Sequence, residues 1–215
     1  MITACSAIGH FELSMTIHSK VLKLGIESSS FMENTFIDMY SKCGDICAAY
    51  LIFYRLCSQD VISWNAIVAG YALHGLAIES LLLVIRMQQT DSKPNDVTFL
   101  GMLSACSHAG MLEVGYFVFY FMVKQQEMLP TTDHFVCLVD LLARVGHVEA
   151  AEAVIESLPL DITTVIWRAL LSACRVHSCV QLASCVIEHL LSCEGQDASS
   201  LSLLSNILAA AEGHE

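Results

Sequence analysis

VISWNAIVAGYALHGLAIESLLLVIRMQQTDSKPN, residues 61–95, is the stretch that decides the fold. Two apolar runs of helical length flank Gly75, and Pro94 follows the second run. Glycine suits a tight turn that needs positive φ, and a proline just past a helix ends it without loss of a helical hydrogen bond. The stretch therefore predicts a helical hairpin, with one helix, a turn at Gly75, a second helix and a stop at Pro94.

The same pattern recurs along the chain. Turn glycines follow one another at steps of 31 to 36 residues, at Gly9, Gly44, Gly75, Gly110 and Gly146, and Ser178 takes the turn position of a later, degenerate copy. Self-similarity at this period is the sequence signature of stacked helical repeats. It predicts an all-α fold, a right-handed superhelical solenoid of about six antiparallel helical hairpins.

Four segments resemble plant pentatricopeptide repeats: NTFIDMYSKCGDICAAYLIF, VISWNAIVAGYALHG, DVTFLGMLSACSHAGMLEVG and HFVCLVDLLARVGHVEAAEAVIESLP. The alternation of repeat lengths resembles the PLS subclass, which combines short, standard and long repeats. The segments VIWRALLSACRVHSCVQLASCVIEHLL and SLLSNILAAA resemble the C-terminal E-type extension of that subclass.

The resemblance implies a division of the chain into seven units. These are a truncated long-type repeat at 1–29, a short-type repeat at 30–60, a standard repeat at 61–95, a long-type repeat at 96–131, a short-type repeat at 132–163, an E-type motif at 164–197 and a truncated second E-type motif at 198–215. The first and last units lack part of a hairpin, and no signal or transit peptide is visible. We therefore expect a piece of a longer protein or a truncated gene product.

The composition is strongly apolar, with 55% hydrophobic and 15% charged residues. Stacked hairpins account for this bias, because each helix then buries two faces. The rival explanation is a membrane span at 97–123, but that stretch contains a glycine turn in its middle. We expect no membrane segment.

Cysteines provide the only metal-site candidate. The cluster has a CxxHxC pattern without a CxxC pair, at Cys174, His177, Cys179 and Cys185. Cys5, Cys106 and Cys174 occupy the same repeat position, in the tripeptide SAC each time, which is typical of a small buried side chain. We expect buried free thiols, no metal and no cofactor.

Catalytic motifs are missing from the sequence, which contains no GxSxG, P-loop or HExxH pattern. HxE pairs at 10–12 and 147–149 resemble half of a nucleobase-deaminase signature, but no PCxxC follows. Both pairs fall at the turn position of a repeat and are interpreted as first-turn residues of a second helix. We predict that the chain is not an enzyme.

Helical-repeat RNA binders read one base per repeat with two or three side chains. In the family that this chain resembles, the fifth and last residues of a repeat read the base and the second wedges between neighbouring bases. The resemblance implies that Asn34 with Asp60 favours uracil, and that Asn65 with Asn95 favours pyrimidines, cytosine first. Weaker pairs, which match no clean code, are Leu100 with Thr131 and Val136 with Thr163. The wedging residues implied are Phe31, Ile62 and Val97.

Two observations oppose base reading. Asparagine is also common at solvated helix starts, which is a second interpretation of Asn34 and Asn65. The formal net charge is −12, with ten Lys and Arg that form no basic stripe, whereas phosphate contacts normally supply much of the affinity for nucleic acid. Any RNA binding should therefore be weak and act mainly through the bases.

The leading hypothesis is sequence-specific binding of single-stranded organellar RNA. By resemblance, this binding serves site recognition for C-to-U RNA editing in a mitochondrion or chloroplast, without a catalytic domain of its own. The E-type region from Thr164 onward would dock a protein of the editing complex, and neither a membrane nor a small-molecule substrate is implied. The alternatives are a protein–protein interaction scaffold and a non-functional fragment of a longer repeat protein.

Overall fold

The computed structural model describes residues 11–24, 29–158, 166–167 and 186–187, in two compact units, Met1–Leu129 and Pro130–Glu215. Every regular element in these ranges is helical, so the predicted all-α class is confirmed. The cysteine and histidine cluster at 174–185, Thr163 and nearly all of the E-type region lie outside the described residues.

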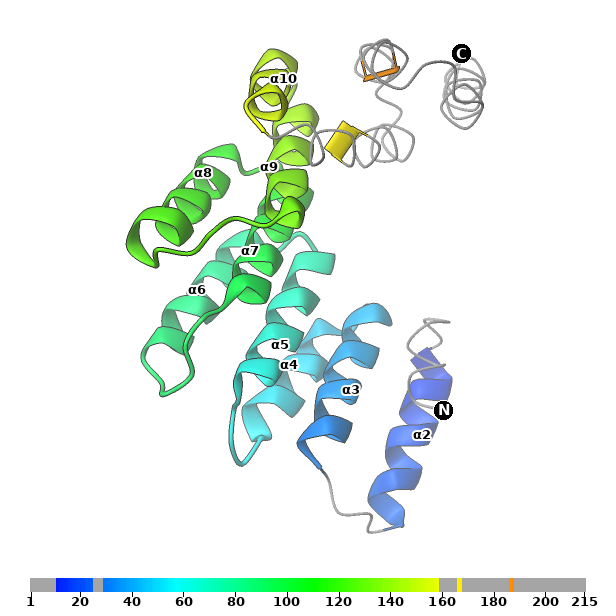
Figure 1. Ribbon diagram of the computed structural model, residues 1–215. Coiled ribbons are helices and arrows are strands. Elements are labelled where there is room, and N and C mark those ends of the chain that lie inside the picture. The colour runs from blue at the N-terminus through cyan, green and yellow to red at the C-terminus, as the bar shows by residue number, and fades with distance from the viewer. Residues whose placement is uncertain (1–10, 25–28, 159–165, 168–185, 188–215) are drawn as a thin grey trace, which may run out of the picture. The chain divides into compact units, whose positions relative to one another are not determined.

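The first unit is a series of helical hairpins. Helix α2 (Phe11–Lys23) precedes three hairpins, formed by α3 (Ser30–Lys42) with α4 (Ile46–Arg55), α5 (Val61–Leu73) with α6 (Ala77–Gln88), and α7 (Asp96–Ala109) with α8 (Leu112–Tyr120) (Figure 1). Gly75 joins α5 to α6 with φ +64°, in the left-handed region that disfavours residues with a Cβ. Gly44 and Gly110 have φ of +90° and +65°, so the positive φ expected of the turn glycines is confirmed.

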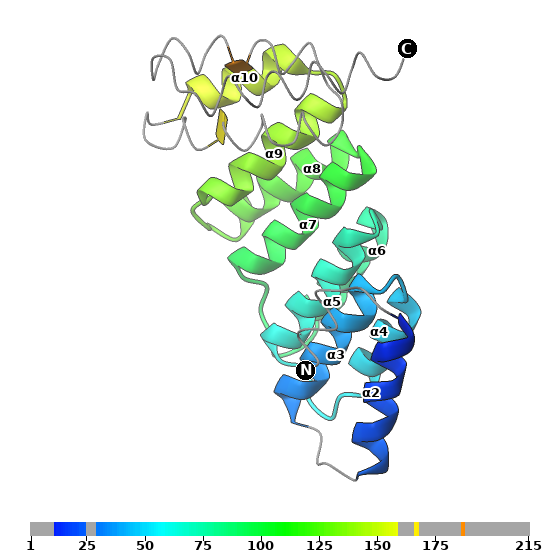
Figure 2. The ribbon, with the colours of Figure 1, turned by 90° about the vertical axis from the view of Figure 1, so that its right-hand side faces the viewer.

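The second unit contains one described hairpin, α9 (Thr132–Arg144) and α10 (Val148–Glu156) (Figure 2). Gly146 joins its helices with φ +85°. Leucines of α9 and small or branched side chains of α10 form its buried core: Leu138, Leu141, Leu142, Ala151 and Ile155.

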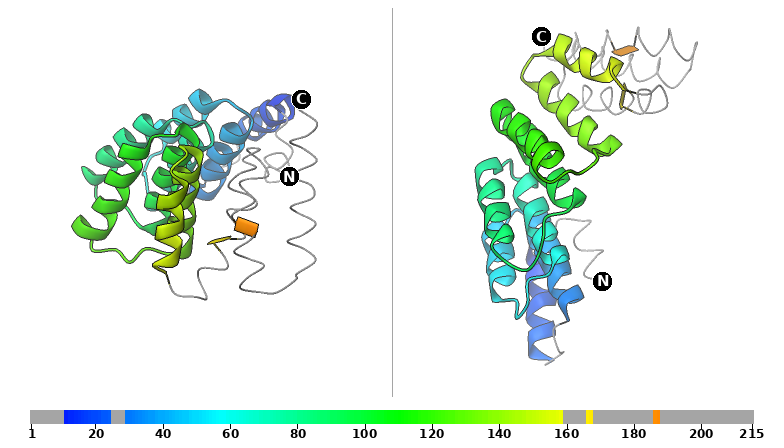
Figure 3. Two further views of the ribbon diagram at one scale, coloured as in Figure 1. Left: turned by 90° about the horizontal axis from the view of Figure 1, so that it is seen from above. Right: turned by 60° about the vertical axis from the view of Figure 1, so that its left-hand side comes forward.

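The first helices of the hairpins in the first unit lie side by side, since α5 contacts both α3 and α7 (Figure 3). The second helices α4 and α6 each pack against their own first helix and against the next one, α4 against α3 and α5, and α6 against α5 and α7. Close approach depends on glycine, because a Cβ at Gly70 of α5 would overlap the Ser41 hydroxyl of α3. A Cβ at Gly101 of α7 would lie 2.8 Å from Val68 Cγ1 of α5.

A large aromatic side chain anchors the core at the centre of the first unit. Trp64 of α5 is fully buried, and its ring meets that of Phe53 of α4 edge to face at 4.7 Å. Burial of each such side chain stabilises the fold by about 1.5–3 kcal/mol. Ser63 and Asn65 are the chain neighbours of Trp64, so the packing of this ring also holds the backbone on which these two residues lie.

Imidazole side chains connect successive hairpins. His74 Nε2 lies 2.9 Å from the Ser41 carbonyl oxygen of α3, and His108 Nδ1 lies 2.7 Å from the Ala72 carbonyl oxygen of α5. In each case the ring N–H donates to a carbonyl in the last turn of the preceding first helix, where intrahelical donors run out. A histidine-to-carbonyl contact therefore recurs one hairpin later, through Nε2 of His74 and through Nδ1 of His108.

Helix α8 continues into a π-helical turn, η1 (Phe121–Gln125), which the sequence pattern does not predict. The wider turn inserts an extra residue, so the consecutive residues Phe121 and Met122 both make apolar contacts. The Phe121 ring lies 6.2 Å from that of Phe99, and Met122 is fully buried. No helix in the described ranges is both long and apolar enough to cross a bilayer.

Candidate nucleic-acid interface

Helix capping positions the last residue of each predicted repeat. Asp60 is the N-cap of α5, and its Oδ1 accepts from the Ser63 backbone N–H at 2.8 Å. Asn95 is the N-cap of α7, and its Oδ1 accepts from the Thr98 backbone N–H at 3.1 Å. Thr131 takes the same place in α9. Each of these side chains is therefore held at the start of the following first helix, independently of any ligand.

The structure brings Asn65 and Asn95 together. Asn65 Nδ2 donates to Asn95 Oδ1 at 3.0 Å, so the fifth residue of one hairpin meets the residue that caps the next. Thr98 lies against both, with its Oγ1 2.6 Å from Asn65 Oδ1. Both asparagines are half-buried, which excludes a freely solvated helix start for Asn65.

Asn34 and Asp60 line one open groove of about 430 Å³ between α3 and α5. Phe31 and Ile62, two of the residues singled out as wedges, line the same groove. Asn34 is half-buried, and its Oδ1 is buried without a hydrogen bond to any described residue. A buried amide oxygen left unpaired costs about 1–3 kcal/mol, so this side chain has a hydrogen-bonding capacity that the protein itself does not use.

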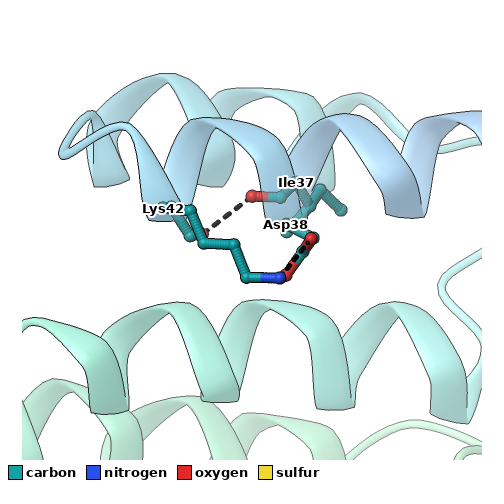
Figure 4. Close-up of polar contacts among 4 residues, drawn as sticks. Ile37, Asp38 and Lys42 are labelled. Atoms are coloured by element: carbon teal, nitrogen blue, oxygen red, sulfur yellow. Dashed lines mark hydrogen bonds and ion pairs between the residues drawn. The ribbon is translucent and has the colours of Figure 1, made fainter. Parts of the chain in front are cut away.

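The groove carries a carboxylate that is held ionised. The hydrogen bond from the Ser63 hydroxyl, 2.6 Å from Oδ1, and the one from the Ser63 backbone lower the pKa of Asp60 below its usual value. Asp38 also lines the groove, and Lys42 pairs with it at 2.8 Å (Figure 4). At neutral pH the groove therefore offers a hydrogen-bond acceptor at Asp60.

The second residues of α3, α5 and α7 are large, apolar and exposed. Phe31 is 79% exposed, Ile62 65% and Val97 51%. Exposed apolar side chains at one register position leave apolar surface for a planar ligand between successive hairpins. In α9 the corresponding residue is Asp133, so the series ends there.

The structure describes the members of the weaker pairs only separately. Leu100 is half-buried in the first unit, whereas Thr131 caps α9 in the second. Val136 is half-buried in α9, and its partner Thr163 lies outside the described residues. Neither Leu100 nor Val136 offers a hydrogen-bonding side chain.

Sequence reasoning missed the buried polar residue that follows each of the capping residues by three positions. Ser63 and Thr98 are fully buried, and His134 is 1% exposed. Asn95 and Thr98 form a reciprocal capping box, as do Thr131 and His134. The Asn-x-x-Thr spacing at 95–98 was the available signal, because it resembles the pattern of a capping box.

Metal-binding groups do not converge within the described ranges, where no three His, Cys, Asp or Glu side chains come together. Cys106, predicted to be a buried thiol, is 1% exposed and unpaired as a disulfide. Burial raises its pKa to about 11, so it remains a neutral thiol at physiological pH. Cys5 and Cys174 lie outside the described residues.

Comparison with known proteins identifies the repeat. The family model described as "PPR repeat" matches residues 62–90 and 97–126, which contain most of the α5–α6 and α7–α8 hairpins and η1.

Three Arabidopsis thaliana relatives match nearly the whole chain. Pentatricopeptide repeat-containing protein At3g29230 is 39% identical over 100% of this chain and 36% of its own length. The chloroplastic protein At1g08070 is 39% identical over 98% of this chain and 29% of its own. The mitochondrial protein At1g06140 is 37% identical over 97% and 38%. The chain thus spans between 29% and 38% of the length of these relatives.

Among solved structures, the pentatricopeptide repeat protein PPR10 in complex with an 18-nt psaJ RNA element aligns with a TM-score of 0.62. The match is 18% identical and covers 100% of this chain and 33% of that chain, so it shows the shared helical-repeat fold. The chain therefore contains pentatricopeptide repeats at 62–90 and 97–126 and is homologous to plant proteins that contain such repeats.

Proposed function

We propose that this chain binds single-stranded RNA in a sequence-dependent manner, with Asn34–Asp60 and Asn65–Asn95 as its base-reading pairs. The observation that carries the proposal is the meeting of Asn65 with Asn95 across 3.0 Å. A fifth residue and a capping residue that touch can act on one base edge together. Successive hairpins can then each take one base, as in other helical-repeat RNA binders.

The chemistry of the two pairs differs. Uracil carries an N3–H donor between two carbonyl oxygens, which suits a carboxylate acceptor at Asp60 beside an amide at Asn34. Cytosine has acceptors at O2 and N3, which suit the amide N–H groups of Asn65 and Asn95. We therefore expect a uracil–cytosine step in register with these two pairs.

Apolar contacts supply the remaining binding energy. Phe31, Ile62 and Val97 are exposed at equivalent places, where the faces of unstacked bases can pack against them. Phe31 is the aromatic residue of the three, and stacking of a base on such a side chain contributes about 1–3 kcal/mol without basic residues. This contribution is compatible with a chain whose net charge is −12.

The biological context proposed is RNA processing in a mitochondrion or chloroplast. The names of two relatives place them in one or other organelle, and PPR10 has been solved with an RNA element. Within that context we propose site recognition for C-to-U editing. The repeats, in their PLS-like order, would recognise the RNA sequence next to the editing site. The E-type region would dock a protein of the editing complex, and another domain or protein would supply catalysis.

A second candidate function is a protein–protein scaffold. The observation that favours it is the second-helix surface, where large apolar side chains are exposed at Leu51, Tyr54, Leu82 and Tyr120. Combined with the negative net charge, this surface suits a protein ligand better than a polyanion.

Fluorescence anisotropy with short single-stranded RNAs tests the proposal. One RNA carries uracil–cytosine in register with the two pairs, and a matched RNA carries purines there. The Asn34→Thr variant is measured beside the wild type, because by resemblance threonine with Asp60 favours guanine. Tighter binding of the uracil–cytosine RNA, shifted toward guanine by the substitution, supports base reading. Equal or absent binding by helical, folded protein would overturn it and favour the scaffold.

A further inference from the structure

A buried polar side chain contacts the capping residue at the start of three of the described first helices, α5, α7 and α9. The third residues of α5, α7 and α9 are Ser63, Thr98 and His134. Each approaches the side chain of the preceding capping residue to between 2.6 and 2.9 Å. These side chains are buried, so a base cannot reach them directly, but they contact a residue that a base is proposed to touch.

At Thr98 the contacts extend to both members of the pair. Its Oγ1 lies 2.6 Å from Asn65 Oδ1 and 2.9 Å from Asn95 Oδ1. The same oxygen accepts from the Asn95 backbone N–H at 3.0 Å. Thr98 is therefore the residue that joins the fifth residue of one hairpin to the cap of the next.

Donor and acceptor balance fixes the orientation of both amides. Asn95 Oδ1 accepts from the Thr98 backbone N–H and from Asn65 Nδ2, so the atom at that position must be oxygen. The single hydroxyl proton of Thr98 then goes to Asn65 Oδ1, which is the nearer oxygen and accepts no other hydrogen bond from the described residues. The Thr98 hydroxyl donates to Asn65, Asn65 donates to Asn95, and the Thr98 backbone N–H also donates to Asn95, so the cycle of hydrogen bonds closes through the backbone of Thr98.

The cycle leaves mostly N–H groups for a ligand. Within the described part of the chain, every side-chain hydrogen bond of Asn95 falls on Oδ1, so both protons of its Nδ2 remain available. Asn65 Nδ2 retains one proton, whereas its Oδ1 already accepts from the Thr98 hydroxyl with one of its two lone pairs. A donor-rich pair matches cytosine, whose central Watson–Crick atom N3 is an acceptor, better than uracil, whose N3 carries a proton.

We propose that Thr98 is a positioning residue for base choice: its hydroxyl holds the Asn65–Asn95 pair in the donor-presenting arrangement that favours cytosine over uracil. The inference rests on the proposed RNA binding. Without the hydroxyl, Asn65 Oδ1 loses its donor, and the amide oxygen can then accept a hydrogen bond from the base instead. Uracil N3–H donates such a bond and cytosine N3 does not.

Ser63 provides a matched control inside the chain. Ser63 is the third residue of α5, as Thr98 is of α7, and its hydroxyl donates to Asp60 Oδ1 at 2.6 Å. The two oxygens of a carboxylate are both acceptors, so Asp60 presents the same chemistry whether or not Ser63 fixes its orientation. Loss of the Ser63 hydroxyl should therefore leave the base preference at the Asn34–Asp60 pair unchanged.

The test compares wild type, Thr98→Val, Thr98→Ser and Ser63→Ala in the full chain. Anisotropy is measured with two RNAs that differ by cytosine or uracil at the base in register with Asn65–Asn95. Thr98→Val should lower the cytosine-over-uracil affinity ratio about fivefold, the factor expected from one hydrogen bond of about 1 kcal/mol. Thr98→Ser keeps the hydroxyl and should keep the ratio. Ser63→Ala should keep both this ratio and the uracil preference at the neighbouring pair.

Circular dichroism confirms folding, and Thr98→Ala, with its higher helix propensity, replaces the valine variant if that one unfolds. An unchanged ratio in the folded Thr98 variant, beside a wild type that prefers cytosine, would overturn the inference and leave the proposed function standing. A folded wild type that binds neither RNA would overturn both. A smaller ratio in Ser63→Ala as well would show a general effect of the buried hydroxyls and also contradict the role assigned to Thr98.

Discussion

Gly70→Ala tests how closely the first helices approach. The new Cβ would overlap Ser41 Oγ of α3 and lie 3.1 Å from both Ser41 Cβ and Ile46 Cδ1. Ser41 is buried, and its Oγ donates to the Ile37 carbonyl at 2.8 Å, so it cannot move aside without the loss of that bond. Overpacking of this kind costs about 1–3 kcal/mol, and the broken hydrogen bond adds about 1 kcal/mol.

The gain in helix propensity opposes this cost, since alanine is better than glycine in a helix interior by about 1 kcal/mol. The free energy of unfolding should therefore fall by about 1–3 kcal/mol, measured by urea titration of the circular dichroism signal. Ala69→Gly, at an exposed neighbouring position, measures the propensity difference without the clash.

The double variant Gly70→Ala with Ser41→Gly removes the atoms that the new methyl group meets. We expect it to be more stable than the sum of the two single changes predicts, by about 1–3 kcal/mol. A Gly70→Ala protein as stable as the wild type, or additive effects in the double variant, would refute the close approach of α3 and α5.

Three further predictions concern the surface, the thiols and the charge. Ile62→Ala should change the free energy of unfolding by less than about 0.5 kcal/mol, because the side chain is exposed, yet weaken RNA binding several-fold in anisotropy. The control is Ile78→Ala, at an exposed position on α6. Equal losses of RNA affinity in the two variants would contradict the wedging role of Ile62. Because burial raises the pKa of the Cys106 thiol to about 11, the stability that its neutral form contributes is present below pH 9 and is lost as the pH rises toward about 11. If urea titrations show the same alkaline loss of stability in Cys106→Ala, that thiol is not the cause. The RNA association constant K should depend weakly on salt, so a plot of log K against the logarithm of the salt concentration should have a slope shallower than about −2. A steeper slope would reveal phosphate contacts, which the net charge argues against.

The hairpins could be predicted from the sequence because their signals are local. Gly75 sets the turn by its own φ, and Pro94 ends the hairpin by its own missing N–H. The place of Asn95 was predictable for a related reason, since an N-cap lies at a fixed point of the helix that it begins.

The remaining features depend on tertiary contacts. Thr98 reaches Asn65 across 33 residues at 2.6 Å, and a local pattern does not encode that contact. The π turn at Phe121–Gln125 accompanies a contact between the Phe121 ring and Phe99, which is distant in the sequence. The close approach at Gly70 likewise appears only when α3 and α5 are stacked.

The most direct test of base reading by paired side chains is Asn95→Asp. Aspartate is as good an N-cap as asparagine, so α7 should keep its start and its stability. The substitution replaces the amide donors with an acceptor, and the pair Asn65 with residue 95 then has the chemistry of Asn34 with Asp60. Anisotropy with RNAs that carry cytosine or uracil at this base should show the preference move from cytosine to uracil. An unchanged preference in a folded, RNA-binding variant would contradict the central claim that these two side chains read the base.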